Sequence, residues 1–278
     1  SLLTIRAVDS VDPTDVTMDI IWTGDTADVE RLQLTEQGQP VDVEWEPRPA
    51  DPPAAVVFVV DQSEPMGEAN VLSTAVNTIR EWVEEADPST AFGIVGVGDT
   101  AVMLQDVTTN RTSIERAVQR LTLRSGVEQA AMWSGARLGA ASLRSSPEVQ
   151  GNLVVITGTN DVLSGQESAA RGELRTSGAV PFVAAYAGGD LDVGPWVEFA
   201  DIGGGLVRTV DDGLEIGAPM NTFDGVVTDD QYRLRFSSPL GVEYAETLAG
   251  EAAADDDEPT VAPTPEPGEY VLTVGGEQ

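Results

Sequence analysis

The sequence predicts an α/β fold, in which a doubly wound, mainly parallel sheet is inserted into a small all-β sandwich. Three observations predict it. Apolar runs typical of strands that are buried on both faces alternate with amphipathic helical stretches through the middle of the chain. The regions before and after that middle part show the period-two alternation of half-buried strands. The chain has 278 residues, 41% of them hydrophobic, which is enough for one or two domains with their own cores.

The N-terminal region is predicted to form short strands. Residues 3–7 alternate apolar and polar side chains, and residues 16–22 repeat the pattern. Gly38 lies between two further short apolar segments and predicts the turn of a hairpin. Three prolines within residues 48–53 predict a linker to the next region.

The middle region is predicted to alternate strands and helices. Its first strand, Ala54 to Val60, contains no polar residue. The apolar residues from Leu72 to Val83 recur at helical spacing, and Thr112 and Glu115 fit a capping box, which predicts that Thr112 begins the next helix. Further strands are expected at residues 92–97, 102–107, 153–156, 180–187 and 206–210, and further helices at residues 132–143, 167–176 and 196–202.

The C-terminal region returns to a strand pattern. Residues 232–236 and 270–274 alternate again, whereas residues 250–268 are acidic and rich in proline, which predicts a mobile loop. The economical arrangement pairs these strands with the N-terminal ones. The predicted domains are therefore 1–50 with the first sandwich strands, 54–225 with the α/β fold, and 228–278 with the remaining sandwich strands.

The composition excludes several function classes. The sequence contains no His, no Cys and no Lys, since all 15 basic residues are Arg. Catalytic triads with His, Cys nucleophiles, Schiff-base lysines and zinc sites of His or Cys are therefore impossible. The formal net charge of −32 argues against nucleic acid as a partner. The longest apolar run, Ala54 to Val60, is far too short to insert into a membrane.

The loop after the first buried strand carries a recognisable motif. It reads Asp61-Gln62-Ser63-Glu64-Pro65-Met66-Gly67 and leads into an amphipathic helix. An apolar strand followed by Asp-x-Ser-x-x-Met and a helix resembles the von Willebrand factor type A (VWA) domain, which has a Rossmann-like fold. The resemblance covers about residues 54–210, and it implies a site at the carboxyl ends of the strands.

The resemblance implies that the metal-ion-dependent adhesion site of this family is degenerate here. In the family, two serines, a threonine and two aspartates hold a divalent cation. Asp61 and Ser63 match the first two ligand positions. Pro65 replaces the second serine, Ala130 the threonine and Gly158 the second aspartate, so three oxygen ligands are missing. We therefore expect no bound metal and no other cofactor.

An alternative keeps a Mg²⁺ or Ca²⁺ site with different ligands. Asp61 and Ser63 would then be joined by an acidic residue from a nearby loop. The candidates are Glu64, Glu128, Asp161 and Asp99.

The expected function is a non-enzymatic protein–protein interaction module. Loops 62–68, 124–133 and 158–165 are expected to make the contacts. The acidic surface indicates either a basic patch on the partner or a salt-tolerant soluble face. The predicted contact residues are Gln62, Glu64, Glu128, Trp133 and Asp161.

The strands outside the VWA-like region resemble a particular group of bacterial proteins. The segment 35–41 and the segment 232–239 are similar to the extracytoplasmic part of VWA proteins that are encoded with tight-adherence pilus and type II secretion F components. The resemblance implies a pilus or secretion component as partner. It also implies an extracytoplasmic location and a membrane anchor in segments outside this sequence.

Two other functions remain open from the sequence. Adjacent carboxylates, as in Asp211-Asp212 and Asp229-Asp230, are the groups that a carboxylate-dependent hydrolase would need, although such pairs on loops are usually solvated charge. A rigid spacer in a pilus or secretion assembly is the other alternative.

Overall fold

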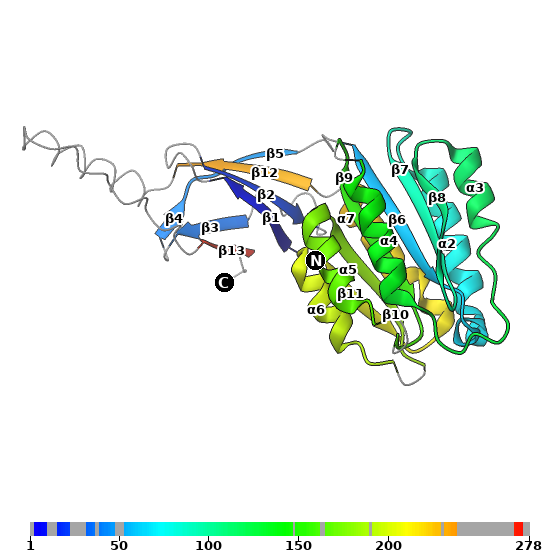
Figure 1. The fold of residues 1–278 in the computed structure, drawn as a ribbon. Helices are drawn as coiled ribbons and strands as arrows, with labels where there is room; N and C mark the ends of the chain where they lie inside the picture. The colour runs from blue at the N-terminus through cyan, green and yellow to red at the C-terminus, as the bar shows by residue number, and fades with distance from the viewer. Residues whose placement is uncertain are drawn as a thin grey trace, which may run out of the picture. The chain divides into compact units, whose positions relative to one another are not determined.

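A computed structural model describes residues 3–9, 16–22, 32–36, 39–47, 53–146, 148–161, 165–188, 191–228, 231–237 and 270–274. The chain divides into two compact units. One unit combines residues 1–49 with residues 230–278, and the other runs from Ala50 to Asp229. Segments from both ends of the chain therefore belong to one unit (Figure 1).

The first unit contains two antiparallel sheets. Its strands are β1 (Leu3–Asp9), β2 (Val16–Trp22), β3 (Leu32–Glu36), β4 (Gln39–Val41), β5 (Glu44–Pro47), β12 (Gln231–Phe236) and β13 (Tyr270–Val274). The sheet orders are β1-β2-β12-β5 and β13-β3-β4. Strand β12 pairs with β2 and β5, and β13 pairs with β3, so each sheet joins segments that are far apart in the sequence.

Leu34 pairs with Val41 across the predicted hairpin of β3 and β4. The packing of the two sheets as a sandwich and the predicted domain boundaries stay predictions. The predicted mobile loop, residues 250–268, lies outside the described residues.

The second unit is built on a six-stranded sheet, as the sequence predicted. Its strands are β6 (Ala54–Asp61), β7 (Ala91–Val97), β8 (Ala101–Thr108), β9 (Gln150–Thr157), β10 (Val180–Tyr186) and β11 (Leu206–Val210). The order is β11-β10-β9-β6-β7-β8, and only the edge strand β8 runs antiparallel to its neighbour. The doubly wound, mainly parallel α/β fold is confirmed.

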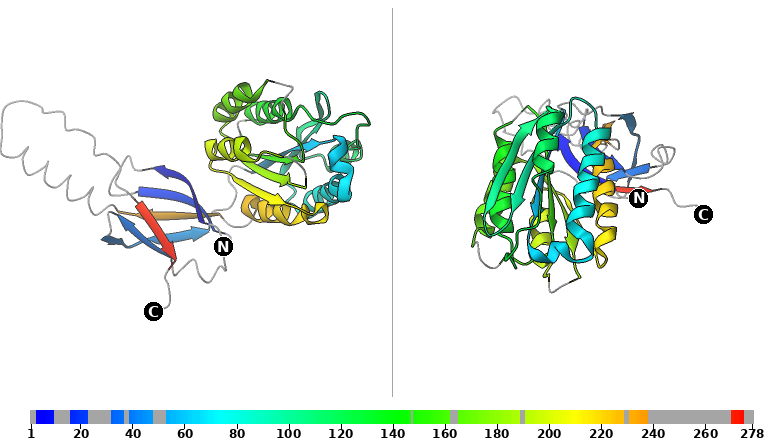
Figure 2. Two further views of the ribbon diagram at one scale, coloured as in Figure 1. Left: turned by 90° about the horizontal axis from the view of Figure 1, so that it is seen from below. Right: turned by 90° about the vertical axis from the view of Figure 1, so that its right-hand side faces the viewer.

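Helices cover both faces of this sheet (Figure 2). They are η1 (Glu64–Asn70), α2 (Val71–Glu85), α3 (Arg111–Val118), α4 (Met132–Arg144), α5 (Glu167–Ser177), α6 (Gly194–Ile202), η2 (Gly213–Glu215) and α7 (Gly217–Thr228). Helices α4, α5 and α6 lie on one face, and α2, α3 and α7 lie on the other. Among the described residues, no helix is both long enough and apolar enough to cross a membrane.

The strand β6 shows why the sheet needs helices on both sides. All of its eight residues are buried. Val57 and Val59 belong to the core beside α4, whereas Phe58 makes an edge-to-face contact with Trp82 of α2 at a ring-centroid distance of 5.1 Å. Successive side chains of a strand point to opposite faces, so an uninterrupted apolar run requires two apolar layers.

Helix α4 lies close to the sheet because it carries two glycines there. A Cβ atom on Gly135 would lie 2.5 Å from Val97 Cγ2, and one on Gly139 would lie 2.6 Å from Leu153 Cδ1. These glycines allow the helix backbone to approach strands β7 and β9. The first turn of α4 is thereby positioned next to the loops that follow the strands.

Two local predictions need correction. Helix α3 is capped by Asn110, whose Oδ1 accepts a hydrogen bond from Ser113 N at 3.1 Å, so the predicted start at Thr112 is wrong. The asparagine lies earlier in the chain and is an equally good N-cap. Helix α7 was not predicted, because Gly217, Pro219 and Gly225 reduce helix propensity. Its contacts with α2 and β10 favour the helix despite this.

Candidate interaction site at the carboxyl ends of the strands

Three loops meet above the carboxyl ends of β6 and β9, and we call them the top loops: residues 62–70, 121–131 and 158–161. Backbone hydrogen bonds join the first two, since Glu64 N donates to Val127 O at 2.8 Å and Arg124 N donates to Gln62 O at 2.7 Å. The third loop is joined to the second where Ala130 N donates to Thr159 Oγ1 at 3.3 Å. These three segments therefore form one surface, and residues 162–164 of the predicted third loop lie outside the described residues.

Asp61 lies at the centre of the top loops, at the end of β6. Its Oδ1 accepts hydrogen bonds from Ser63 N at 2.8 Å and from Ser63 Oγ at 2.5 Å. Its Oδ2 accepts from Gly158 N at 3.1 Å and from Thr159 Oγ1 at 2.9 Å. Asp61, Ser63 and Thr159 are all buried, so the carboxyl group ties the first loop to the third without help from solvent.

Burial raises the pKa of the Asp61 carboxyl above its ordinary value of 3.8. Loss of solvation disfavours the charged form, and this effect outweighs the four hydrogen bonds, which act in the opposite direction. The carboxyl therefore holds a proton more tightly in the folded protein than in the unfolded chain.

Thr159 is a site residue that the sequence reasoning missed. Its hydroxyl donates to Asp61 and accepts from Ala130 N, so it contacts both other top loops. The side chain of Thr157 supports it, because Thr157 Oγ1 accepts from Thr159 N at 3.3 Å. The sequence did carry a signal: a second hydroxyl residue follows Gly158 in Ile-Thr-Gly-Thr, where the family motif has glycine.

The three replaced ligand positions have structural roles of their own. Pro65 lies in the first turn of η1, where its missing N–H has no consequence. Ala130 is buried beside Thr159. Gly158 gives room to Met66, since a Cβ atom at this position would lie 2.9 Å from Met66 Sδ. The apolar Met66 side chain, which is fully buried, thus lies where a longer residue at position 158 would extend.

The acidic residues proposed as alternative ligands are spread around the site. Glu64 Oε1 accepts a hydrogen bond from Gly126 N at 2.7 Å, and Asp161 Oδ2 accepts from Trp133 N at 2.7 Å. Glu128 and Asp99 are exposed. Within the described ranges, no group of three or more acidic side chains is arranged so that it could hold a metal ion. Two of the four candidates therefore stabilise loops, and the other two face solvent.

Two of the predicted contact residues are corrected by the structure. Gln62 is buried, and its Nε2 donates to Thr122 O at 2.8 Å and to Arg120 O at 3.3 Å. Trp133 is buried as well and stacks on Trp196 at a ring-centroid distance of 4.0 Å. Neither side chain faces solvent. Gln62 is hydrogen-bonded to the second loop, and Trp133 of α4 packs against Trp196 of α6.

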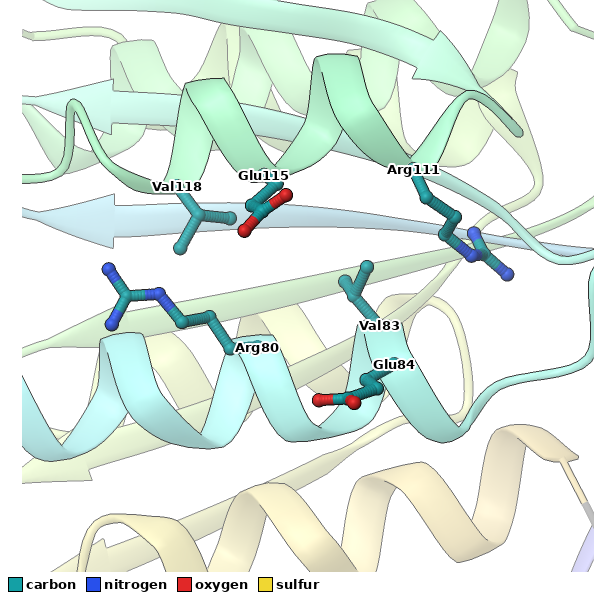
Figure 3. Close-up of a pocket in the computed structure, with 6 residues that line it drawn as sticks. All are labelled: Arg80, Val83, Glu84, Arg111, Glu115 and Val118. Atoms are coloured by element: carbon teal, nitrogen blue, oxygen red, sulfur yellow. The ribbon is translucent and has the colours of Figure 1, made fainter.

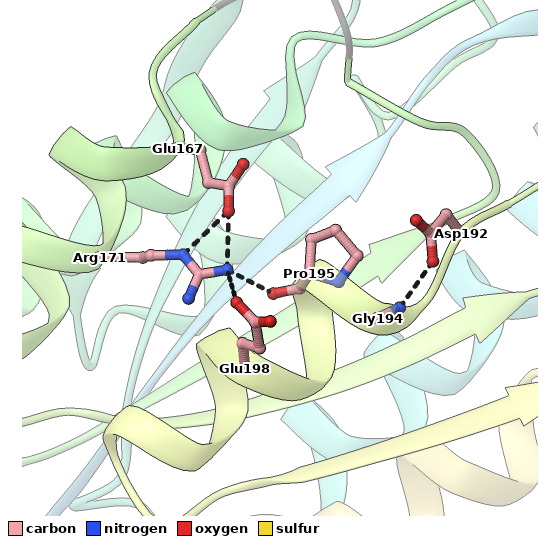
Figure 4. Close-up of polar contacts among 6 residues, drawn as sticks. All are labelled: Glu167, Arg171, Asp192, Gly194, Pro195 and Glu198. Carbon is pink, nitrogen blue, oxygen red and sulfur yellow. Dashed lines mark hydrogen bonds and ion pairs between the residues drawn. The ribbon is translucent and has the colours of Figure 1, made fainter.

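The helices that leave this edge of the sheet are held together by Arg171 (Figure 4). Its Nη2 lies 2.7 Å from Glu167 Oε1 and 2.9 Å from Glu198 Oε2, which links α5 to α6. Asp192 Oδ1 accepts from Gly194 N at 3.0 Å at the start of α6. Asp192 N in turn donates to Asn160 Oδ1 at 2.8 Å, which ties the start of α6 to the third top loop.

Comparison with known proteins identifies the fold of this unit. The family model described as the von Willebrand factor type A domain matches residues 56–160. The α/β unit contains a VWA domain. The matched segment begins in β6 and ends after Thr159, so it includes the whole hydrogen-bond cluster around Asp61. VWA domains are protein-interaction modules and are generally not enzymes. A comparison with curated proteins finds no match.

Solved structures share the VWA fold with this chain. A von Willebrand factor type A protein from Catenulispora acidiphila has a TM-score of 0.55 at 11% identity, and the match covers 80% of this chain and 48% of that one. Proximal thread matrix protein 1 from the mussel byssus, with a zinc-occupied metal-ion-dependent adhesion site, has a TM-score of 0.54 at 19% identity, covering 70% and 50%. The N-terminal domain of TFIIH p34 has 0.50 at 12%, covering 60% and 96%.

The chain spans about half the length of the Catenulispora and mussel proteins, which it matches over 48% and 50% of their lengths. At these sequence identities the likeness extends to the fold alone.

Proposed function

We propose that this protein is a non-enzymatic interaction module whose VWA domain binds a protein partner through the top loops without a metal ion. The observation that carries the proposal is the saturation of Asp61. Both of its carboxyl oxygens accept hydrogen bonds from groups of the protein itself. In a metal-dependent adhesion site, oxygen atoms at this position have to face the cation and its water shell.

The donor set around Asp61 does not fit a divalent cation. Ser63 Oγ donates to Asp61, and Thr159 Oγ1 does the same, so both hydroxyl groups are engaged within the protein. Positions 65, 130 and 158 supply no side-chain oxygen. Mg²⁺ requires near-octahedral oxygen coordination and loses its hydration water reluctantly. We infer that the cluster is a degenerate adhesion site in which hydrogen bonds hold the loops that a cation holds elsewhere.

The surface that remains for a partner is acidic. Glu64, Glu128 and Asp99 are exposed on or beside the top loops. With a net charge of −32 on the chain, a basic partner surface is attracted over a distance and an acidic one is repelled. A basic protein surface is therefore the partner that this module fits.

A metal-dependent module is the second candidate, and the zinc-containing mussel protein of the same fold is the observation that favours it. Asp61 and Ser63 would then be assisted by Glu64, Glu128 or Asp161. Isothermal titration with Mg²⁺, Ca²⁺, Mn²⁺ and Zn²⁺ distinguishes the two. We expect no saturable heat from the wild type.

The matched variants are Asp61→Ala and Asp87→Ala. Asp87 is exposed, and it accepts hydrogen bonds from Ser89 N and Ser89 Oγ in the same local geometry. A saturable isotherm that Asp61→Ala abolishes and Asp87→Ala retains would refute the metal-free proposal.

We propose an extracytoplasmic location, with a membrane anchor in segments outside this sequence and a role in pilus assembly or secretion. The support is the resemblance of residues 35–41 and 232–239 to such proteins. Protease treatment of intact cells that produce the full-length protein tests the location. Degradation of the VWA domain is expected, and complete protection until the cells are lysed would contradict it.

A further inference from the structure

Two adjoining hollows lie along helix α2, beside the top loops, and we call them together the α2 groove. The first has a volume of about 400 Å³ and lies between α2 and α3, lined by Arg80, Val83, Glu84, Arg111, Glu115 and Val118 (Figure 3). The second has a volume of about 310 Å³, and Met66, Gly67, Val76, Arg80, Leu121 and Leu123 are among its lining residues. Arg80 lines both hollows, so they adjoin.

The base of the α2 groove is apolar. Val76 and Val83 of α2 are buried there, as are Val118 and Leu121 on the opposite side. Leu123 is the exception, because 48% of its surface is exposed, and it covers Gly67. Val76 and Val83 are two helical turns apart, or about 10 Å. Apolar side chains that are seven residues apart on one face of a second helix are separated by the same distance of about 10 Å.

The charged groups of the first hollow differ in their availability. Arg111 is engaged, since its guanidinium donates to Thr90 O at 2.9 Å and to Asp87 O at 2.7 Å and lies over the ring of Phe92. Arg80 Nη1 donates to Asn77 Oδ1 at 3.2 Å. Glu84 of α2 and Glu115 of α3 are exposed, and in the described part of the chain no hydrogen bond or ion pair engages either carboxylate. The groove therefore presents two free carboxylates, one from each helix.

We propose that the α2 groove is a second docking surface, which binds a basic amphipathic helix of a protein partner. The apolar face of that helix would fill the two hollows, and its Lys or Arg side chains would pair with Glu84 and Glu115. The lining contains two arginines and two glutamates, but Arg80 and Arg111 donate hydrogen bonds within the protein, whereas neither glutamate has such a partner among the described residues. The unpaired carboxylates and the net charge of −32 on the chain favour a basic occupant. The second hollow includes Met66, Gly67, Leu121 and Leu123 of the top loops, so the α2 groove borders the surface of the proposed function, but docking there does not depend on whether Asp61 holds a metal.

A hydrolytic use of the same two carboxylates is less consistent with the structure. A general acid needs a carboxyl group in apolar surroundings that keep it protonated. Glu84 and Glu115 are both exposed at the mouth of the groove. Exposed carboxylates suit pairing with cations.

The test uses a labelled synthetic peptide of Leu, Ala and Lys, about 18 residues long so that it is able to form a helix, with its leucines on one face. Fluorescence anisotropy measures its binding to the whole chain. A peptide of the same composition with leucines distributed around the helix is the first control, and a peptide with Glu in place of Lys is the second. The patterned basic peptide is expected to bind about tenfold more tightly than the first control, and the acidic peptide is expected not to bind.

The protein variants locate the binding surface. Glu84→Gln with Glu115→Gln is expected to weaken binding by about three- to tenfold, since two exposed ion pairs are lost. Glu148→Gln with Glu215→Gln makes the same change in charge at exposed sites that do not line the groove, and it is expected to have no more than a small effect. Leu123→Ser should weaken binding as well, because it removes the exposed apolar side chain of the second hollow.

Three results would overturn the proposal. They are equal binding of the patterned and distributed peptides, equal weakening by the groove and control pairs, and a larger loss from Glu64→Gln with Glu128→Gln in the top loops. Circular dichroism and urea unfolding of each variant show whether a loss of binding reflects a loss of fold. All of the changed residues are exposed, so their effects on stability are expected to be small, and Glu64→Gln keeps an amide oxygen that is able to accept from Gly126 N.

Discussion

Replacing Asp61 by alanine tests whether a hydrogen-bonded carboxyl group holds the top loops together. The substitution removes the acceptor for four donors: Ser63 N, Ser63 Oγ, Gly158 N and Thr159 Oγ1. The two hydroxyl groups are able to rotate toward other acceptors. The two backbone N–H groups are fixed, and their surroundings are buried, so they are left without a partner.

The expected loss follows from those two N–H groups. A buried donor without a partner costs about 1–3 kcal/mol, so two of them cost about 2–6 kcal/mol. Removal of a carboxyl group whose burial raises its pKa gives part of this back. We therefore expect Asp61→Ala to lower the free energy of unfolding by about 2–4 kcal/mol. For a unit of this size, each kcal/mol corresponds to about 2–4 °C in Tm.

Urea unfolding followed by tryptophan fluorescence is the assay, with calorimetry as a second measurement. Asp87→Ala is the matched control, because Asp87 makes the same two contacts with Ser89 that Asp61 makes with Ser63, but in an exposed turn. Water replaces the lost acceptor there, so a much smaller change is expected. Equal losses in the two variants, or a loss below about 1 kcal/mol for Asp61→Ala, would show that the cluster does not organise the loops.

Two further predictions concern the same site. Because the pKa of Asp61 is raised on folding, its contribution to stability is greatest below pH 3.8 and declines as the pH rises through the folded pKa. The unfolding free energy of the wild type minus that of Asp61→Asn should therefore fall between pH 3.8 and neutrality, and a rise would contradict the assignment. Gly158→Ala should destabilise the protein by about 1–3 kcal/mol in urea unfolding, because its Cβ would crowd buried Met66. Gly172→Ala is the control: its Cβ meets open space within α5, so it should stabilise the protein by up to about 1 kcal/mol. A stabilising effect of Gly158→Ala would refute the packing argument.

The sequence was most informative where burial imposes a repeating pattern. The uninterrupted apolar run of β6 predicted a strand covered on both faces, and the stripe from Leu72 to Val83 predicted α2, because each pattern matches one backbone geometry. It was least informative where tertiary contacts override local preference. Helix α7 forms despite Pro219 and two glycines, since Met220 and Phe223 are buried in the unit's core.

The candidate site shows the same division between local and tertiary information. The motif after β6 placed Asp61 and Ser63 at the carboxyl edge of the sheet, and the structure puts them there with Gly158, which follows β9. The burial of Gln62 was not predictable from its residue type, because glutamine is mostly exposed in folded proteins, and Trp133 lies in the first turn of a helix beside the predicted site. Their burial depends on partners far along the chain, namely Thr122 for Gln62 and Trp196 for Trp133.

By itself, the sequence determined the α/β architecture of the second unit and the absence of a side-chain oxygen at positions 65, 130 and 158, because apolar periodicity and residue identity are local properties. The tertiary structure alone decided which groups the Asp61 carboxyl contacts. The partner of the Asp61 carboxyl on the far loop is Thr159, which is 98 residues away in the chain. Only the pairing of β6 with β9 brings the two together, and such contacts between distant segments are set by the packing of the whole sheet.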